Sequence, residues 1–265
     1  MYTRFQLAKK YIQYYLTSAN GKGHGVHSPF VFNFIKFVLN DRKKYAAYNT
    51  IENSRKELLQ NTQTIEVADF GAGSTVIKTK QRRIKDIAAS SLKPKKYSAL
   101  LMRMIQYYQY QQVVELGTSL GVTTCYIAAA QNKPSVVTME GAPQVAKIAQ
   151  HYFKQHQYTN IKLIEGNFDI TLSQYLQLNP KIDLVFIDGN HRKQPTINYF
   201  HQLLAAMNEE GCMVFDDIHW SAEMEAAWAY IKAHESVTLS IDLFFIGIVF
   251  FKKDFKVKQH FTIRF

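Results

Sequence analysis

Short apolar runs alternate with longer amphipathic stretches from about residue 97 to residue 251 of the 265-residue chain. The apolar runs have the length of buried strands, and the stretches between them have the three- and four-residue spacing of helices. The expected strands are residues 113–116, 135–139, 161–165, 182–187 and 211–215. The expected helices are residues 97–110, 121–131, 143–156, 170–176, 196–207 and 223–234. Repeated units of this kind predict a mostly parallel sheet with helices on both faces.

Both ends of the chain depart from this alternation. Residues 237–242 and 246–251 predict a hairpin with one antiparallel strand, and residues 261–265 an additional edge strand. Aromatic residues at helical spacing predict a helix in residues 1–20, and Ser28-Pro29 is typical of a helix start before the apolar residues 30–39. Residues 42–62 are charged and also predict a helix.

We therefore expect an α/β fold with a Rossmann-like doubly wound sheet, mostly parallel with one antiparallel strand in a C-terminal hairpin. A mainly helical N-terminal extension precedes it. The expected division is residues 1–96, a basic extension that serves as a lid or recognises substrate, and residues 97–265, the domain that carries the motifs below.

Charge is distributed unevenly along the chain. Residues 1–110 hold 19 Lys and Arg against 6 Asp and Glu, whereas residues 111–265 hold 13 against 15. A basic surface can attract an anionic substrate, nucleic acid or a membrane face. The basic stretch from Lys78 to Lys96 is more often a solvated or mobile segment than a nucleic-acid site.

Other features of composition indicate a reduced, cytoplasmic protein. Cys125 and Cys212 have no metal-type spacing and are expected to be buried. The N-terminus lacks the continuous apolar region of a signal peptide. The most apolar segment, residues 243–251, is too short to span a bilayer as a helix, so we expect no membrane partner.

The stretch Val113–Thr124 predicts a strand, a glycine turn and a helix start. Its spacing, Glu115-x-Gly117-x-Ser119-x-Gly121, differs from the Gly-x-Gly-x-x-Gly fingerprint of dinucleotide-binding folds. The helix N-terminus suits an anionic group, and the acid suits a cation or hydroxyls. A ligand that carries both charges, such as S-adenosylmethionine (SAM), fits this loop better than NAD does.

A second glycine loop, residues 68–74, resembles a nucleotide loop but lacks the apolar helix that would follow it. We do not assign the cofactor to it.

Four of the predicted strands end in acidic residues: Glu115, Glu140, Asp188 and the pair Asp216-Asp217. In an open parallel sheet the ligand crevice lies at the carboxyl ends of the strands, so these acids are expected to converge. Glu140 follows Gly121 at a distance typical of an acid that accepts both ribose hydroxyls.

The loop that follows the predicted strand 161–165 adds three residues to the expected cofactor site. Gly166 precedes Asn167, which could hydrogen-bond an adenine amine, and Phe168, which could pack on the ring or in the core.

Three carboxylates at adjacent strand ends predict a divalent cation. Asp188, Asp216 and Asp217 repel one another unless a proton or a cation intervenes, and Mg²⁺ prefers oxygen ligands. His191 and His219 lie close to these acids in sequence, and either could act as a general base.

Together these residues resemble a class I SAM-dependent methyltransferase. The resemblance covers roughly residues 97–251 and is strongest to the cation-dependent O-methyltransferases of the catechol and caffeoyl-CoA type and to the family-24 methyltransferases. It implies that Glu115 and the loop Gly117, Thr118, Ser119 and Gly121 hold the methionine part of SAM. It also implies that Glu140 holds the ribose and that Asp188, Asp216 and Asp217 ligate Mg²⁺.

Two residues depart from the catechol type. Asp217 stands where that type commonly has Asn, and His191 stands where it commonly has a catalytic Lys. The leading hypothesis is methyl transfer from SAM to an oxygen of a small molecule, with Asp188 and His191 as the catalytic residues. An RNA-directed methyltransferase and a non-catalytic SAM-binding module are the alternatives. A homodimer is compatible with the sequence.

Overall fold

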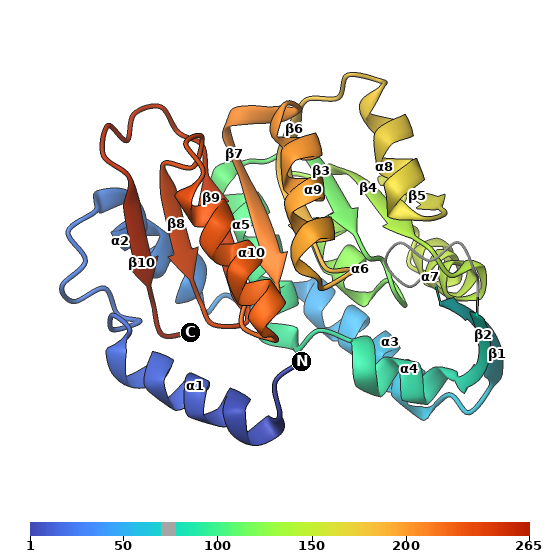
Figure 1. The fold of residues 1–265 in the computed structure, drawn as a ribbon. Helices are drawn as coiled ribbons and strands as arrows, with labels where there is room; N and C mark the ends of the chain where they lie inside the picture. Colours follow the sequence, from blue (N-terminus) through green and yellow to red (C-terminus); the bar gives the residue numbers. More distant parts are fainter. Residues whose placement is uncertain (70–77) are drawn as a thin grey trace. The chain divides into compact units, whose positions relative to one another are not determined.

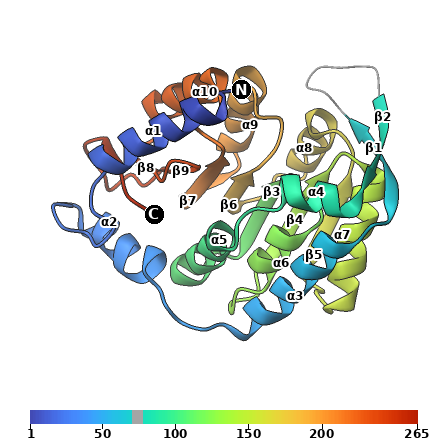
Figure 2. The ribbon, with the colours of Figure 1, turned by 90° about the horizontal axis from the view of Figure 1, so that it is seen from below.

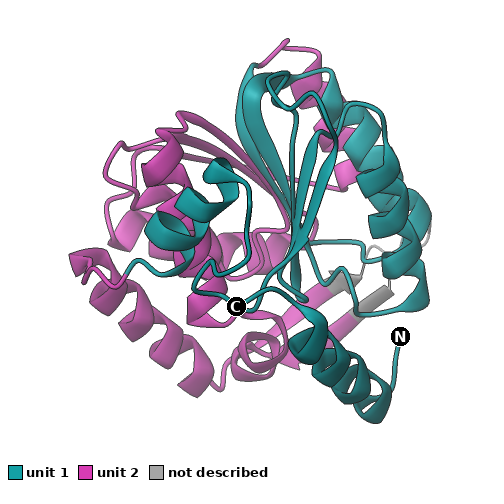
Figure 3. Ribbon diagram, turned by 90° about the vertical axis from the view of Figure 1, so that its left-hand side faces the viewer, with its two compact units in different colours: residues 1–41, 181–265 teal, residues 42–180 magenta. Residues whose placement is uncertain are grey.

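The computed structural model describes residues 1–69 and 78–265 (Figure 1). The chain forms two compact units, residues 1–41 with 181–265 and residues 42–180 (Figure 3). The predicted boundary after residue 96 falls inside the second unit. The glycines of the rejected nucleotide loop, at residues 71 and 73, lie outside the described residues.

Three parallel strands in the order β3-β4-β5 form the sheet of the second unit. The elements are β3 (Gln112–Leu116), α6 (Val122–Ala128), β4 (Ser135–Glu140), α7 (Pro143–Gln155), β5 (Ile161–Glu165) and α8 (Phe168–Leu176). Val113, Val114 and Val136 are buried, as the apolar runs predict for a strand covered on both faces. The strand ends at Glu140 and Glu165 are in register, so residues after them emerge at one edge.

The first part of this unit contains more regular structure than the sequence predicted. Its elements are α3 (Ala46–Gln60), β1 (Thr64–Asp69), β2 (Lys78–Arg83), α4 (Ile84–Ser91) and α5 (Lys95–Tyr108). The basic stretch forms regular structure over residues 78–91 rather than a mobile segment, while Lys80, Arg82 and Arg83 are exposed, as expected for a solvated stretch. Strand β2 pairs with β1, and α4 buries Ile84, Ile87 and Ala88.

Five strands in the order β10-β8-β9-β7-β6 form the sheet of the first unit. They are β6 (Ile182–Ile187), β7 (Met207–Asp216), β8 (Leu239–Asp242), β9 (Ile246–Phe250) and β10 (Gln259–Thr262). Strand β9 pairs antiparallel with β7 and β8, whereas β6 with β7 and β8 with β10 are parallel pairs. This confirms the predicted fold class, a mostly parallel, Rossmann-like α/β fold with one antiparallel strand.

One predicted element boundary in this unit was wrong. The helix expected to end at residue 207 is α9 (Lys193–Leu204), and Met207 already belongs to β7. The carbonyl of Ala206 accepts a hydrogen bond from the amide of Ile182 at 2.9 Å, which joins the chain to β6 at this point. A register shift between Ile182 and Leu184 accommodates the longer strand.

Helices α1 (Arg4–Thr17), α2 (Pro29–Phe34) and α10 (Ala222–Ala233) of the first unit each begin at a side-chain cap. The π-helical turn η1 (Ile35–Leu39) follows α2 directly. Ser28 caps α2 and Pro29 is its first residue, as predicted. Helix α1 lies in front of α10 in the view of Figure 2, and its first turns contact the start of α10.

Among the described residues, no helix is long and apolar enough to cross a membrane. Both cysteines are buried, as expected. Burial raises the pKa of the Cys125 thiol, which therefore stays protonated.

Candidate functional site

The loop between β3 and α6 has the strained backbone that its glycines predicted. Gly117, Ser119 and Gly121 have φ angles of 107°, 47° and 81°. The first and last are favourable for glycine, whereas Ser119 is held in the left-handed region at some energetic cost. At Gly121 a Cβ atom would lie 2.7 Å from the Phe153 ring, so this glycine also lets α6 approach α7 closely.

Glu140 holds this loop in place. One carboxylate oxygen accepts a hydrogen bond from the amide of Ser119 at 2.8 Å, and the other accepts from the amide of Ala142 at 2.9 Å. The residue lies at the end of β4, where the sequence placed the acid that accepts ribose hydroxyls. An acid fixed at two amides is pre-oriented to accept further hydrogen bonds beside the glycine loop.

Glu115 lies beneath the loop and is fully buried. Its carboxylate accepts hydrogen bonds from the hydroxyls of Thr124 and Thr138, and the Thr118 hydroxyl lies 2.6 Å from that of Thr138. The sequence pattern did not indicate either Thr124 or Thr138 as a partner of Glu115.

The other expected cofactor residues lie between β5 and α8. Gly166 has a φ angle of 142°, and its amide donates to the carbonyl of Glu140 at 2.9 Å. Asn167 caps α8 by accepting from the amide of Asp169 at 3.0 Å, and Phe168 is the first residue of that helix. The second unit thus brings Glu140 and Gly166 together, while Asn167 also has a structural role.

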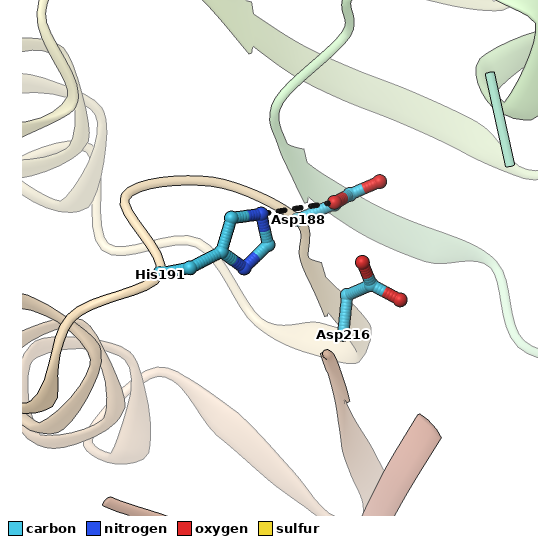
Figure 4. Close-up of side chains that lie close together, drawn as sticks. All are labelled: Asp188, His191 and Asp216. Atoms are coloured by element: carbon cyan, nitrogen blue, oxygen red, sulfur yellow. Dashed lines mark ion pairs between the residues drawn. The ribbon is translucent and has the colours of Figure 1, made fainter. Parts of the chain in front are cut away.

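The first unit gathers three of the predicted site residues. The pairing of Ile187 with Phe215 brings the ends of β6 and β7 level, so Asp188 and Asp216 emerge side by side. One potential ligand atom from each of Asp188, His191 and Asp216 lies within 4.8 Å of the others (Figure 4). The predicted third carboxylate, Asp217, is not a member of this group. Its backbone is left-handed, with a φ angle of 53°.

A tight turn directs His191 back toward Asp188. Asn190 has a φ angle of 57°, and its amide group donates to the Tyr199 hydroxyl at 2.9 Å. The Nε2 atom of His191 lies 3.7 Å from Asp188 Oδ1, the ion pair drawn in Figure 4. Asp216 is buried, whereas Asp188 and His191 are partly exposed, so the group can be reached from solvent on one side.

A separate polar cluster that the sequence analysis missed surrounds His219. Its Nδ1 lies 3.0 Å from Glu225 and its Nε2 lies 2.9 Å from Asp242. Lys10 and the Tyr2 hydroxyl bond to the same Glu225 carboxylate. Asp242 ends a predicted strand, but nothing in the sequence indicated that Tyr2 and Lys10, at the N-terminal end of the chain, would join the cluster.

This cluster favours the protonated form of His219. Burial alone would lower the pKa of His219, but the hydrogen bonds and charges of Asp242 and Glu225 raise it above its ordinary value. The pKa of Asp242 is lowered: burial opposes this, and the bonds from His219, the Phe244 amide and Trp228 outweigh it. Because both ring nitrogens donate to carboxylates, His219 is not available as the general base considered from the sequence.

A cavity of about 290 Å³ adjoins this cluster within the first unit. It is lined by Lys10, Gln13, Tyr14, Thr17, His219, Glu225, Asp242, Phe244 and Thr262. His219 follows Asp216 by three residues, so their Cα atoms are at most about 11 Å apart. A benzene-sized ligand needs a cavity of about 150 Å³, so this one has room for a single substituted ring.

Comparison with known proteins shows a similarity to methyltransferases. Residues 114–218 match the family-24 methyltransferase model, described as a methyltransferase domain. This span contains Glu115, Glu140, Asp188 and Asp216. No curated protein matches the chain.

Solved structures share the fold at low sequence identity. An O-methyltransferase from Bacillus cereus in complex with SAH, the demethylated product of SAM, has a TM-score of 0.56 and 16% identity over 83% of this chain and 97% of its own. The O-methyltransferase TomG from Streptomyces achromogenes, in complex with SAM, has a TM-score of 0.56 and 14% identity over 82% and 95%. The SAH-bound methyltransferase PaMTH1 from Podospora anserina has a TM-score of 0.55 and 14% identity over 81% and 100%.

The chain therefore shares the fold of solved O-methyltransferases, and residues 114–218 match the family-24 methyltransferase model, in agreement with the resemblance inferred from the sequence.

Proposed function

We propose that the chain transfers the methyl group of SAM to an oxygen of a small-molecule acceptor, with a divalent cation held by Asp188 and Asp216 and with His191 beside them as the general base. The observation that carries the proposal is the convergence of these three side chains within 4.8 Å at the ends of two parallel strands. Two carboxylates suit a hard divalent ion such as Mg²⁺, which prefers oxygen ligands. Asp217 lies outside this group, and its role as a further ligand of the cation stays a prediction.

The cofactor part of the proposal uses the residues around β3, β4 and β5. Solved relatives from Bacillus cereus and Streptomyces achromogenes contain SAH or SAM, which supports SAM here. Glu140 would accept the ribose hydroxyls, and the loop from Gly117 to Gly121 would receive the methionine part. Gly166, Asn167 and Phe168 would border the adenine, and Asp188 would lie near the transferred methyl group.

Proton transfer is assigned to His191. Its Nε2 would take the proton of the acceptor hydroxyl, while Asp188 at 3.7 Å stabilises the imidazolium that forms. The acceptor oxygen then bonds to the methyl carbon as the carbon–sulfur bond of SAM breaks, and SAH leaves. A cation at this group would lower the pKa of the hydroxyl and orient it.

Acceptor recognition is assigned to the N-terminal extension, residues 1–96. Helix α1 lines the cavity of about 290 Å³ beside His219, which supports a small acceptor rather than a polymer.

The test is methyl transfer from SAM to a panel of phenols and other hydroxyl compounds, with and without a chelator. We expect Asp188→Ala and Asp216→Ala to abolish turnover while the affinity for SAH stays within several-fold. Asp254→Ala, which removes an exposed carboxylate of the same unit, is the matched control and should keep full activity. Full activity of both site variants in chelator would exclude the metal assignment, and failure of the intact protein to bind SAH would exclude the function.

A further inference from the structure

Helix α1 carries an apolar stripe on the side that faces away from its own unit. Phe5, Ile12 and Leu16 are 81%, 58% and 71% exposed. Intervals of seven and four residues place these side chains on one side of a helix. The opposite side holds Tyr14, which is buried, and Lys10, which is bonded to Glu225. Three large apolar side chains in line on one exposed helix are unusual for a surface without a partner.

The charge around this stripe has a single sign. Residues 1–40 contain five Lys and Arg and no Asp or Glu. On α1 itself, Arg4 and Lys9 are exposed, and Lys9 lies on the same side of the helix as the apolar stripe.

We propose that the outward side of α1 docks onto an anionic lipid surface. Phe5, Ile12 and Leu16 would enter the boundary between headgroups and acyl chains, and Arg4 and Lys9 would meet lipid phosphates. A basic amphipathic helix that lies in the plane of the interface has this composition. Docking of this kind needs no spanning helix, but it departs from the expectation of no membrane partner, which was based on the lack of a segment long enough to span a bilayer.

Two other occupants fit the same surface less well. A second copy of the chain would bring the basic side chains of two α1 helices together with no acid in residues 1–40 to compensate them. Three apolar side chains per copy also bury far less than the roughly 800 Å² per partner of a stable interface. Nucleic acid would pair with Arg4 and Lys9 but would leave the aliphatic side chains of the stripe exposed.

When the outward side of α1 is docked on a membrane, its inward side still lines the cavity. Lys10, Gln13, Tyr14 and Thr17 line that cavity from the same helix. A ligand that partitions into lipid would therefore meet the cavity through the element that touches the membrane. Docking itself does not depend on the methyltransferase assignment.

The experiment is co-sedimentation of the full chain with vesicles of neutral phosphatidylcholine, or of phosphatidylcholine with 30% phosphatidylglycerol as an anionic probe. We expect binding to the anionic vesicles to exceed binding to the neutral ones by about tenfold or more at low salt, and to weaken as salt is raised. The double variant Phe5→Ser with Leu16→Ser should bind about tenfold more weakly or worse, because it loses most of the apolar stripe.

Leu178→Ser is the matched control, since Leu178 is equally exposed but belongs to the other unit. Melting temperatures of all variants should agree, because none of the changed side chains is buried. The proposal is overturned if the wild type does not prefer anionic vesicles or if the control loses as much binding as the double variant. Two further results would overturn it. One is a dimer, seen by light scattering, that the double variant abolishes while vesicle binding persists. The other is a complex with RNA, seen by titration, that behaves in the same way.

Discussion

Replacement of Gly121 by alanine separates two reasons for a glycine at the start of α6. The first is conformational: a φ angle of 81° costs an L-residue about 1 kcal/mol. The second is steric, because the new Cβ atom would lie 2.7 Å from the Phe153 ring and 3.0 Å from the Ala149 Cβ. Overpacking of a core contact costs about 1–3 kcal/mol. We therefore expect Gly121→Ala to lower the free energy of unfolding by about 2–4 kcal/mol in total.

Gly25 provides the matched control for this experiment. Its φ angle of 78° is nearly the same, but a Cβ atom there would meet nothing within 4 Å. Gly25→Ala should therefore cost only the conformational part, about 1 kcal/mol. The assay is urea-induced unfolding followed by circular dichroism, with SAH titration of each variant. If both variants lose the same stability, Gly121 does not determine the packing of α6 against α7, and the close approach is refuted.

Three further outcomes follow from the described contacts. Glu140→Gln should weaken SAH binding by about tenfold or more in calorimetric titration, because a charged acceptor of hydroxyls is lost; unchanged affinity would exclude the ribose role. The His219 cluster should stabilise the fold most between about pH 4 and pH 6.5, since its contribution is lost as pH falls through the lowered pKa of Asp242 and as pH rises through the raised pKa of His219. His219→Gln should remove the alkaline part of this dependence in melting curves, and an unchanged profile would contradict the assignment. Thr138→Val should lower the free energy of unfolding in urea by about 1–3 kcal/mol, because the buried Glu115 carboxylate loses a donor; a neutral effect would mean that Thr124 alone satisfies it.

The sequence was most informative where local pattern and tertiary structure agree. Apolar runs that end in acids correctly predicted β3, β4, β6 and β7, because strands buried on both faces consist mainly of apolar residues. The same reasoning placed Asp188 beside Asp216, since parallel strands in register end at the same edge.

The rest depended on contacts between distant residues. The start of β7 at Met207 depends on a backbone hydrogen bond to Ile182, which no helical periodicity can reveal. The His219 cluster draws its partners from Tyr2, Lys10 and Asp242, so its members are separated by up to 240 residues. The sequence suggested His219 as a possible base because it does not show the carboxylates that surround this side chain. The protonation of a histidine depends on its neighbours in space rather than in sequence.

The residues that line the cavity beside α1 fall into two groups, which differ in how well they tolerate substitution. His219, Glu225 and Asp242 are tied to one another, so replacing any of them disturbs the fold. Gln13 and Thr17 lie on an exposed helix surface, and their side chains are bonded to no other element among the described residues. Substitutions there alter the shape and polarity of the cavity at little cost in folding. Descendants of this chain can therefore diverge in what the cavity admits while they inherit the same scaffold.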